Sequence, residues 1–217
     1  MTKTTINRKL QVVYKKLYKA FGSQNWWPGE TPFEIMIGAI LTQNAAWTNA
    51  EKAIKNLKHG NVLSIQKLLS IKKEKLSRLI RPSGFYNVKA KRLKNFLYYL
   101  SSCYNNSIKR MKKKDLKVLR KELLHVDGIG KETADSILLY ALEKPVFVID
   151  AYTKRILVRH GIVGDDVGYD QMQRLFMDNL PHNRKLFNEY HALIVETGKN
   201  FCKATKPLCR RCPLKGI

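Results

Sequence analysis

Apolar residues recur with the period of an α-helix along almost the whole chain, and this pattern restricts the fold more than any other feature. They stand three or four positions apart, as in Ala134, Ile137, Leu138 and Ala141. Glycine and proline separate such stretches with short connections. The longest segment that resembles a strand is only 146–149. The sequence therefore predicts an all-α protein with about ten helices of ordinary length.

The chain is strongly basic. Its 217 residues include 41 Lys and Arg against 17 Asp and Glu, which gives a net charge of +24 at pH 7. With 44% hydrophobic residues it can also bury a core, so we expect a folded protein and not a disordered basic tail. Such a charge attracts polyanions, of which nucleic acid is the commonest. Basic clusters lie at 72–81, 89–94 and 109–121, although each alone is also typical of a solvated helix face.

The sequence predicts a cytoplasmic protein. No apolar run approaches the roughly 20 residues that a transmembrane helix needs. The first residues lack the apolar core and cleavage site of a secretory signal. We expect a monomer without membrane contact, associated with the nucleoid if its partner is DNA. In that compartment cysteines indicate free thiols or a metal site, and Cys103, alone in a predicted helix, is expected to be a buried thiol.

Residues 123–140, LLHVDGIGKETADSILLY, predict a helix-hairpin-helix. The glycines of the turn, Gly128 and Gly130, allow positive φ and the close approach of a phosphate, and Ile129 between them should point inward. Lys131 and Thr133 follow as further contacts to a DNA backbone. Such contacts hold DNA without reading its sequence. The alternative is an ordinary glycine-containing loop between two helices.

A second glycine turn, PSGFYNVKAK at 82–91, also leads into a basic helix. It offers Gly84 and Lys89 as further contacts to the DNA backbone. Taken alone, this motif is weak.

Together these motifs resemble the endonuclease III superfamily of DNA glycosylases. The resemblance rests on the hairpin, the GFYNVKA turn, the Val-Ile-Asp that ends at Asp150 and a cysteine-rich tail, and it covers roughly residues 25–217. It implies an all-α fold of two helical lobes with a DNA cleft between them. One lobe would be 23–136, with the hairpin at its end. The other would combine 1–22 with 137–217 and carry a C-terminal iron–sulfur loop.

Asp150 follows an apolar run and precedes a basic helix, which is the pattern of a helix N-cap. The resemblance implies that it is also the catalytic aspartate, whose carboxylate stabilises an oxocarbenium-like sugar or polarises water. Bifunctional relatives carry a lysine directly before Thr-Ala that attacks the sugar. Glu132 occupies that place here, and Lys131 lies one position earlier, about 100° around the helix. We therefore expect a monofunctional glycosylase that uses water.

A flipped base needs aromatic walls. All three tryptophans, Trp26, Trp27 and Trp47, stand in one short window, although tryptophans are also common in cores. The WWP motif, followed by LTQN with an aromatic residue three places after the Asn, resembles the branch that removes 3-methyladenine. Such a base is cationic, so stacking on indole gains about 1 kcal/mol or more. Either Gln43 or Asn44 would fill the gap left in the duplex.

Three cysteines, Cys202, Cys209 and Cys212, crowd into the C-terminal tail. Their spacing suits thiolate ligands of a [4Fe–4S] cluster, with zinc as the competitor. It resembles the family's iron–sulfur tail, whose fourth cysteine would fall at position 218, one past Ile217. We expect a cluster with a structural role that displays the neighbouring basic residues to DNA.

The sequence as a whole predicts a base-excision-repair glycosylase. It would hydrolyse the N-glycosidic bond of a flipped alkylated purine, 3-methyladenine above all, in double-stranded DNA. Two alternatives stay open. One is an endonuclease III-like glycosylase and AP lyase that acts on oxidised or deaminated pyrimidines. The other is a non-catalytic helix-hairpin-helix protein that binds DNA.

Overall fold

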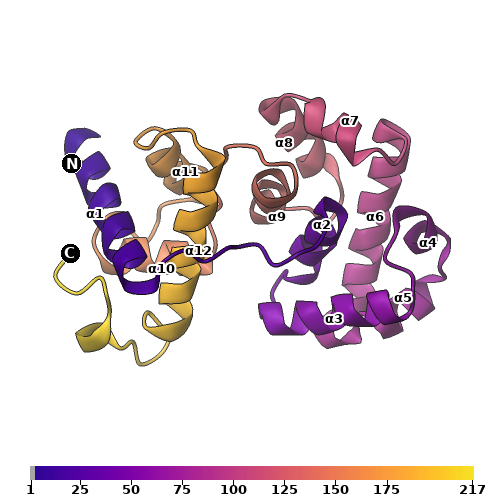
Figure 1. Cartoon of the computed structure of the whole chain (residues 1–217), viewed down its shortest axis with the longest axis horizontal. Helices are drawn as coiled ribbons and strands as arrows, with labels where there is room; N and C mark the ends of the chain where they lie inside the picture. The colour runs from indigo at the N-terminus through magenta and orange to yellow at the C-terminus, as the bar shows by residue number, and fades with distance from the viewer. Residues whose placement is uncertain (1–2) are drawn as a thin grey trace. The chain divides into compact units, whose positions relative to one another are not determined.

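The structure is a computed structural model that describes residues 3–217 (Figure 1). This part of the chain contains twelve α-helices and no strand, so the all-α prediction is confirmed. The number exceeds the predicted ten because very short helices, such as α4 (Ile65–Ser70) and α7 (Ile108–Lys113), interrupt the connections. Within the same residues, no helix combines the length and the apolar character needed to cross a membrane.

Two compact units make up the chain. The terminal unit comprises the N-terminal residues up to Trp27 together with Pro145–Ile217, and the central unit comprises Pro28–Lys144. These boundaries lie further along the chain than the expected ones at 22/23 and 136/137. The first lies later because Ser23 Oγ and the Gln24 backbone N–H donate to the Glu189 carboxylate, at 2.9 and 2.7 Å, which ties this segment to the terminal unit.

In the terminal unit, α12 packs against both α1 and α10. The elements of this unit are α1 (Lys3–Phe21), α10 (Ala151–Arg159), α11 (Tyr169–Met177), α12 (Arg184–Asn200) and the short 3-10 turn η3 (Cys209–Arg211). Aromatic rings fill the core: Phe147 stacks on Phe176 with ring centroids 3.7 Å apart, and Tyr190 meets Phe147 edge-on at 5.8 Å. Phe147 lies in the apolar run 146–149, which is buried but forms no strand. This buried run leads directly to Asp150.

In the central unit, α2 is the core helix and packs against α3, α6, α9 and the π-helical turn η2. Besides α4 and α7, its elements are α2 (Pro32–Leu41), α3 (Trp47–His59), α5 (Lys73–Leu79), η1 (Arg81–Ser83), α6 (Tyr86–Tyr104), α8 (Leu116–His125), α9 (Lys131–Ser136) and η2 (Ile137–Ala141). Eight of the ten residues of α2 are buried. A helix that is apolar all round is typical of a core position. The turn η2 extends α9, which is why the chain stays in this unit past residue 136.

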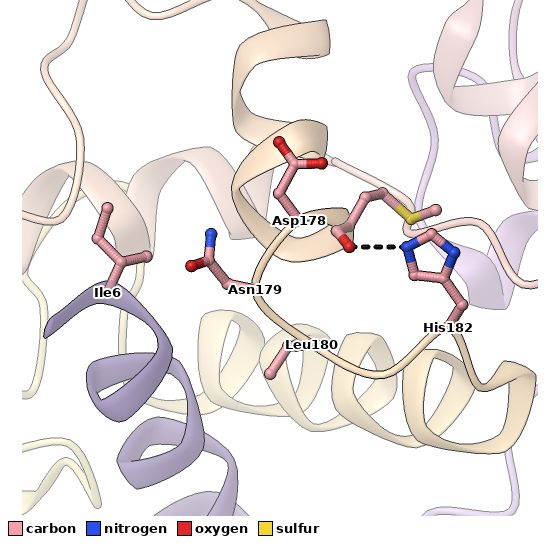
Figure 2. A pocket seen from close by; sticks show the side chains of 6 residues that line it. Ile6, Asp178, Asn179, Leu180 and His182 are labelled. Atoms are coloured by element: carbon pink, nitrogen blue, oxygen red, sulfur yellow. Dashed lines mark hydrogen bonds between the residues drawn. The ribbon is translucent and has the colours of Figure 1, made fainter. Parts of the chain in front are cut away.

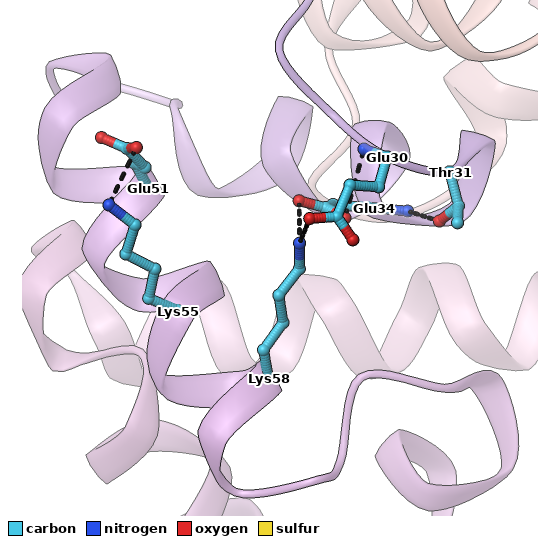
Figure 3. A network of polar contacts seen from close by, with 6 residues as sticks. All are labelled: Glu30, Thr31, Glu34, Glu51, Lys55 and Lys58. Carbon is cyan, nitrogen blue, oxygen red and sulfur yellow. Dashed lines mark hydrogen bonds and ion pairs between the residues drawn. The ribbon is translucent and has the colours of Figure 1, made fainter.

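A polar network fixes the start of α2 (Figure 3). Thr31 caps the helix, because its hydroxyl oxygen accepts the Glu34 N–H at 3.1 Å. Lys58 of α3 bridges the Glu30 and Glu34 carboxylates at 2.8 and 3.0 Å. The network orients the entry into α2 relative to α3, and these two helices flank the LTQN motif.

Candidate functional site

The predicted helix-hairpin-helix is confirmed: α8 ends at His125 and α9 begins at Lys131. Ile129, at the centre of the turn, is 4% exposed and points into the unit as expected. A bidentate ion pair joins the two helices, because Arg120 donates from Nε and Nη2 to the buried Asp135 carboxylate at 2.8 and 3.1 Å. Paired in this way, the two planar groups fix the angle of the hairpin.

The two glycines of the turn serve different purposes. Gly128 has φ of 91°, and a Cβ there would lie 2.3 Å from Cγ of Arg92. The backbone conformation and the packing of Arg92 therefore both require glycine at this position. Gly130 has φ of −88° and a Cβ there would meet nothing within 4 Å. Of the two glycines for which the sequence allows positive φ, only Gly128 adopts it. What its missing side chain provides is room for another molecule to approach the start of α9.

Gln43 braces the hairpin from the end of α2. Its Nε2 donates to the Gly128 carbonyl at 3.0 Å and to the Thr133 hydroxyl at 2.9 Å. Its Oε1 accepts from Arg92 Nη1 at 2.6 Å. Thr133 is buried, so its hydroxyl is directed into the unit and a phosphate contact at Thr133 can involve only the backbone N–H. Gln43 is thus a structural part of the helix-hairpin-helix.

Asn44, the next residue, is exposed and has φ of 50° in the turn that follows α2. Trp47, the first residue of α3, is half-buried three positions later. The structure therefore separates the two amides that the sequence left as alternatives. Gln43 is engaged inside the unit, whereas Asn44 is presented to solvent.

The second glycine turn presents its backbone at the surface. Gly84 is exposed with φ of 68°, and a Cβ there would meet nothing within 4 Å. Phe85, which follows it, has φ of 46° and is 68% exposed. An aromatic side chain held in the left-handed region and offered to solvent is uncommon. Phe85 is not among the residues predicted from the sequence, although its place directly after a glycine in a basic turn indicates exposure.

Lys89 is buried, contrary to the expectation that it contacts DNA. Its side chain is 1% exposed, and Nζ donates to the carbonyls of Leu41 and Ser83 at 2.8 and 2.6 Å. Burial, with a smaller contribution from Arg92, lowers the pKa of Lys89 to about 8. The predicted contact between Lys89 and a DNA phosphate is wrong, because its amine lies inside the unit and joins α2 to the glycine turn.

Asp150 is the N-cap of α10, as the sequence predicted. One carboxylate oxygen, Oδ1, accepts from the Thr153 backbone N–H at 2.7 Å and from the Thr153 hydroxyl at 2.8 Å. The other oxygen, Oδ2, lies 3.6 Å from Nε2 of the buried His191. The side chain of Asp150 is 12% exposed, so the carboxylate is fixed on Oδ1 by Thr153 and still reaches the surface.

Trp26 and Trp27 belong to the terminal unit, the unit that contains Asp150, whereas Trp47 belongs to the central unit. The peptide bond between Trp26 and Trp27 is cis. Their ring centroids lie 5.2 Å apart with the planes tilted by 57°, and both side chains are half-buried. A pair of indoles that is partly exposed in this way offers aromatic surface to a planar ligand.

The cysteine tail holds three thiols. Cys202 is buried, Cys212 is half-buried and Cys209 is exposed. The pKa of the Cys212 thiol is raised, chiefly by burial and to a smaller extent by the neighbouring Cys202 and Cys209. Among the described residues, no group of three or more His, Cys, Asp or Glu side chains is arranged to hold a metal ion. The [4Fe–4S] cluster expected from the spacing of these thiols therefore stays a prediction.

Two arginines of α10 anchor this tail. Arg155 Nε donates to the Cys202 carbonyl at 2.6 Å. Arg159 donates to the carbonyls of Lys203 and Ala204 at 2.6 and 2.9 Å, and Nη1 lies 3.3 Å from the Cys202 sulfur. The tail is therefore positioned by the helix that Asp150 begins.

Cys103 is exposed, contrary to the expectation of a buried thiol. It lies in the last turn of α6, where Leu100 and Tyr104 face the core and residue 103 falls on the outer side. Its position gives it no part in the site.

A separate hollow of about 660 Å³ lies in the terminal unit near the end of α11 (Figure 2). It is lined by Ile6, Met177, Asp178, Asn179, Leu180 and His182. His182 Nε2 contacts the Met177 carbonyl at 2.8 Å, and Asn7 donates to the Asn179 carbonyl. None of the site residues predicted from the sequence lines this hollow.

Comparison with known proteins agrees with this geometry. Residues 37–182 match the family model described as HhH-GPD superfamily base excision DNA repair protein. A candidate DNA repair glycosylase of Methanocaldococcus jannaschii is 51% identical over 94% of this chain and 92% of its own length.

Two solved structures are similar to the whole chain. The 3-methyladenine DNA glycosylase of H. pylori, bound to 1,N6-ethenoadenine, has a TM-score of 0.76 and 30% identity, and the match covers 92% of this chain and 98% of that one. A trapped covalent intermediate of endonuclease III with DNA has a TM-score of 0.83 and 23% identity, with 99% and 94% covered, which shows the shared fold. This chain belongs to the HhH-GPD superfamily of base excision DNA repair proteins.

Proposed function

We propose that this protein is a monofunctional DNA glycosylase that removes alkylated purines, 3-methyladenine above all, from double-stranded DNA. The observation that carries the proposal is the Asp150 carboxylate. It caps α10, is held on Oδ1 by Thr153, and is still 12% exposed. A fixed carboxylate at the surface is suited to stabilise the positive charge that develops on the sugar as the base leaves, or to orient the water that replaces it.

The substrate class is supported by an aromatic pair in the terminal unit, the unit that also contains Asp150. Trp26 and Trp27 present indole surface, and a cationic 3-alkylated adenine gains cation–π stabilisation of about 1 kcal/mol or more on such a surface. Because that base already leaves readily, the reaction needs no strong general acid. The similarity to the H. pylori 3-methyladenine glycosylase, at 30% identity, supports the same substrate class.

Hydrolysis without strand cleavage is supported by the start of α9. The position at which bifunctional relatives carry the attacking lysine holds Glu132, whose carboxylate cannot form a Schiff base. Lys131 is exposed at the first position of the helix, next to Gly130, where an ammonium group is placed to contact a phosphate.

DNA contact through the central unit follows from its exposed elements. The backbone at Gly130 and at Gly84 is open to close approach, and structural neighbours of the chain are complexes with DNA. Asn44, which follows Gln43, and Phe85, which follows Gly84, are exposed, and we assign them to the gap that a flipped nucleotide leaves in the stack. The cysteine tail enters as a structural element anchored by α10.

The test is base release from duplexes that carry one lesion each: 3-methyladenine, uracil or thymine glycol. The wild type is compared with Asp150→Asn and with the control Asp178→Asn, which changes an exposed carboxylate of the same unit. We expect release of 3-methyladenine by the wild type and the control, and loss of about a hundredfold or more in Asp150→Asn.

Other outcomes distinguish the alternatives. Release of pyrimidine lesions only would retain Asp150 and discard the role of the tryptophans. A covalent adduct trapped by borohydride on an abasic duplex would contradict the water-only mechanism. Normal duplex binding without release of any base would identify a non-catalytic DNA-binding protein.

A further inference from the structure

The imidazole of His191 lies against the carboxylate of Asp150. Its Nε2 is 3.6 Å from Oδ2, and the two side chains come from α12 and from the residue that begins α10. These two helices pack against each other. The side chain of His191 is only 6% exposed, so a buried histidine faces the N-cap carboxylate of α10.

The surroundings of the ring explain its charge state. Phe147 meets the imidazole edge-on with ring centroids 6.3 Å apart, and Tyr190, also buried, precedes it on α12. Burial lowers the pKa of His191, and the Asp150 carboxylate opposes this shift without reversing it. The imidazole is therefore neutral at pH 7, and a neutral imidazole can donate one hydrogen bond without adding a charge.

We propose that His191 is a positioning residue that holds Oδ2 of Asp150 by an Nε2–H donor while Thr153 holds Oδ1. With Thr153 alone, the carboxylate is held at one oxygen and can turn about its Cβ–Cγ bond. A second donor fixes the plane of the carboxylate and hence the direction in which its charge faces the sugar. The separation of 3.6 Å is that of a loose contact, and such contacts often tighten when substrate binds.

A neutral imidazole suits this arrangement better than a charged one. An imidazolium beside Asp150 would compete with the developing sugar cation for the negative charge of the carboxylate. A neutral donor orients the carboxylate and leaves its charge available. His191 thus acts through Asp150 and does not itself touch the substrate. This inference deepens the proposed function and rests on it for the assignment of Asp150 to the reaction.

The kinetic test compares three variants in single-turnover base release. His191→Phe keeps an aromatic ring against Phe147 but removes the donor, and His191→Gln keeps an N–H close to the position of Nε2. His182→Gln changes an exposed histidine of the same unit as a control. We expect His191→Phe to be slower by about ten- to a hundredfold, which is the cost of misplacing a reacting group by a fraction of an ångström to 1 Å. We expect His191→Gln to recover most of the rate, and the Kd for an abasic duplex to be the same in all of them.

The inference is overturned if folded His191→Phe releases base at the wild-type rate, or if His191→Gln is as slow as His191→Phe, since only packing would then matter.

A second measurement needs neither His191→Phe nor a substrate. An NMR titration of the His191 ring in wild type and in Asp150→Asn should show a lower pKa in the variant, because the carboxylate that raises it is gone. An equal pKa in both proteins would show that the two groups are not in contact. Base release absent in the wild type, with the pKa difference present, would refute the proposed function and keep the contact.

Discussion

Gln43 donates from Nε2 to the Gly128 carbonyl at 3.0 Å, and this bond joins the end of α2 to the turn of the hairpin. The same side chain also accepts from Arg92, whose alkyl portion lies over Gly128. The turn of the hairpin is therefore held from the side by two residues that are distant from it in the sequence.

Gln43 should contribute both to stability and to DNA binding, because it braces the hairpin. Gln43→Met removes the hydrogen bonds that Gln43 makes with the Gly128 carbonyl and the Arg92 guanidinium. Because these bonds are partly buried, we expect the free energy of unfolding to fall by about 1 kcal/mol, together with weaker binding to an undamaged duplex. Urea unfolding and fluorescence anisotropy measure the two effects. A variant as stable as the wild type would show that the brace is dispensable.

Asn44 should behave in the opposite way. Because its side chain is exposed, we expect Asn44→Ala to leave the unfolding free energy within about 0.5 kcal/mol of the wild type. Base release should slow, since nothing then fills the gap in the duplex. Fluorescence of 2-aminopurine opposite the lesion reports on the flipped state, and unchanged fluorescence and rate in Asn44→Ala would rule out the assignment.

The two glycines of the hairpin provide a matched pair of variants. Gly128→Ala places a Cβ at φ of 91° and against Arg92, so we expect a loss of about 1–3 kcal/mol in stability. Gly130→Ala meets nothing in the chain, so it should be as stable as the wild type and yet bind duplex DNA more weakly. Equal DNA affinity of Gly130→Ala and wild type would mean that no phosphate approaches this point.

Lys89 and Lys131 should separate stability from DNA affinity. Lys89→Met leaves the buried carbonyls of Leu41 and Ser83 without their donor, and we expect a loss of about 1–3 kcal/mol in stability with no change in the salt dependence of binding. Lys131→Ala should keep its stability and lower the slope of log K against log salt by about one. The reverse pattern in the two variants would restore Lys89 as the phosphate contact.

Acidification should destabilise the protein through His191. Its pKa in the folded state is lowered, chiefly by burial, so the unfolded chain binds more protons below the ordinary histidine pKa of about 6.5. The free energy of unfolding therefore falls as the pH drops from about 6.5 toward the folded pKa. Urea titrations at several pH values should show a smaller fall in His191→Gln than in the wild type. Identical pH dependence in both proteins would indicate that His191 titrates normally.

The local features of this fold could be read from the sequence, because each depends on neighbours in the chain. Helical periodicity predicted the all-α fold, the glycines and the apolar residue between them predicted the hairpin, and the residue types around Asp150 predicted its N-cap. Caps and turns follow from side chains a few positions apart. These are the features that the structure confirms.

Features that depend on distant pairs could not be read in this way. Lysine is among the residues least often buried. Nothing near Lys89 in the sequence indicates that two backbone carbonyls will accept hydrogen bonds from its ammonium group. The contact between Asp150 and His191 joins α10 to α12, and its existence depends on how those helices pack. The boundary after residue 136 was also missed, since a π-helical turn has no simple sequence pattern.

The anchoring of the cysteine tail bears on how such a chain can evolve. Arg155 and Arg159 bind main-chain carbonyl groups, and a carbonyl is present whatever side chain the residue carries. Replacement of a thiol therefore leaves the bonds to the carbonyl groups in place, whereas replacement of either arginine removes some of them. Selection for the shape of the tail therefore acts on Arg155 and Arg159 of α10, and descendants of this sequence are freer to vary the cysteines than these two arginines.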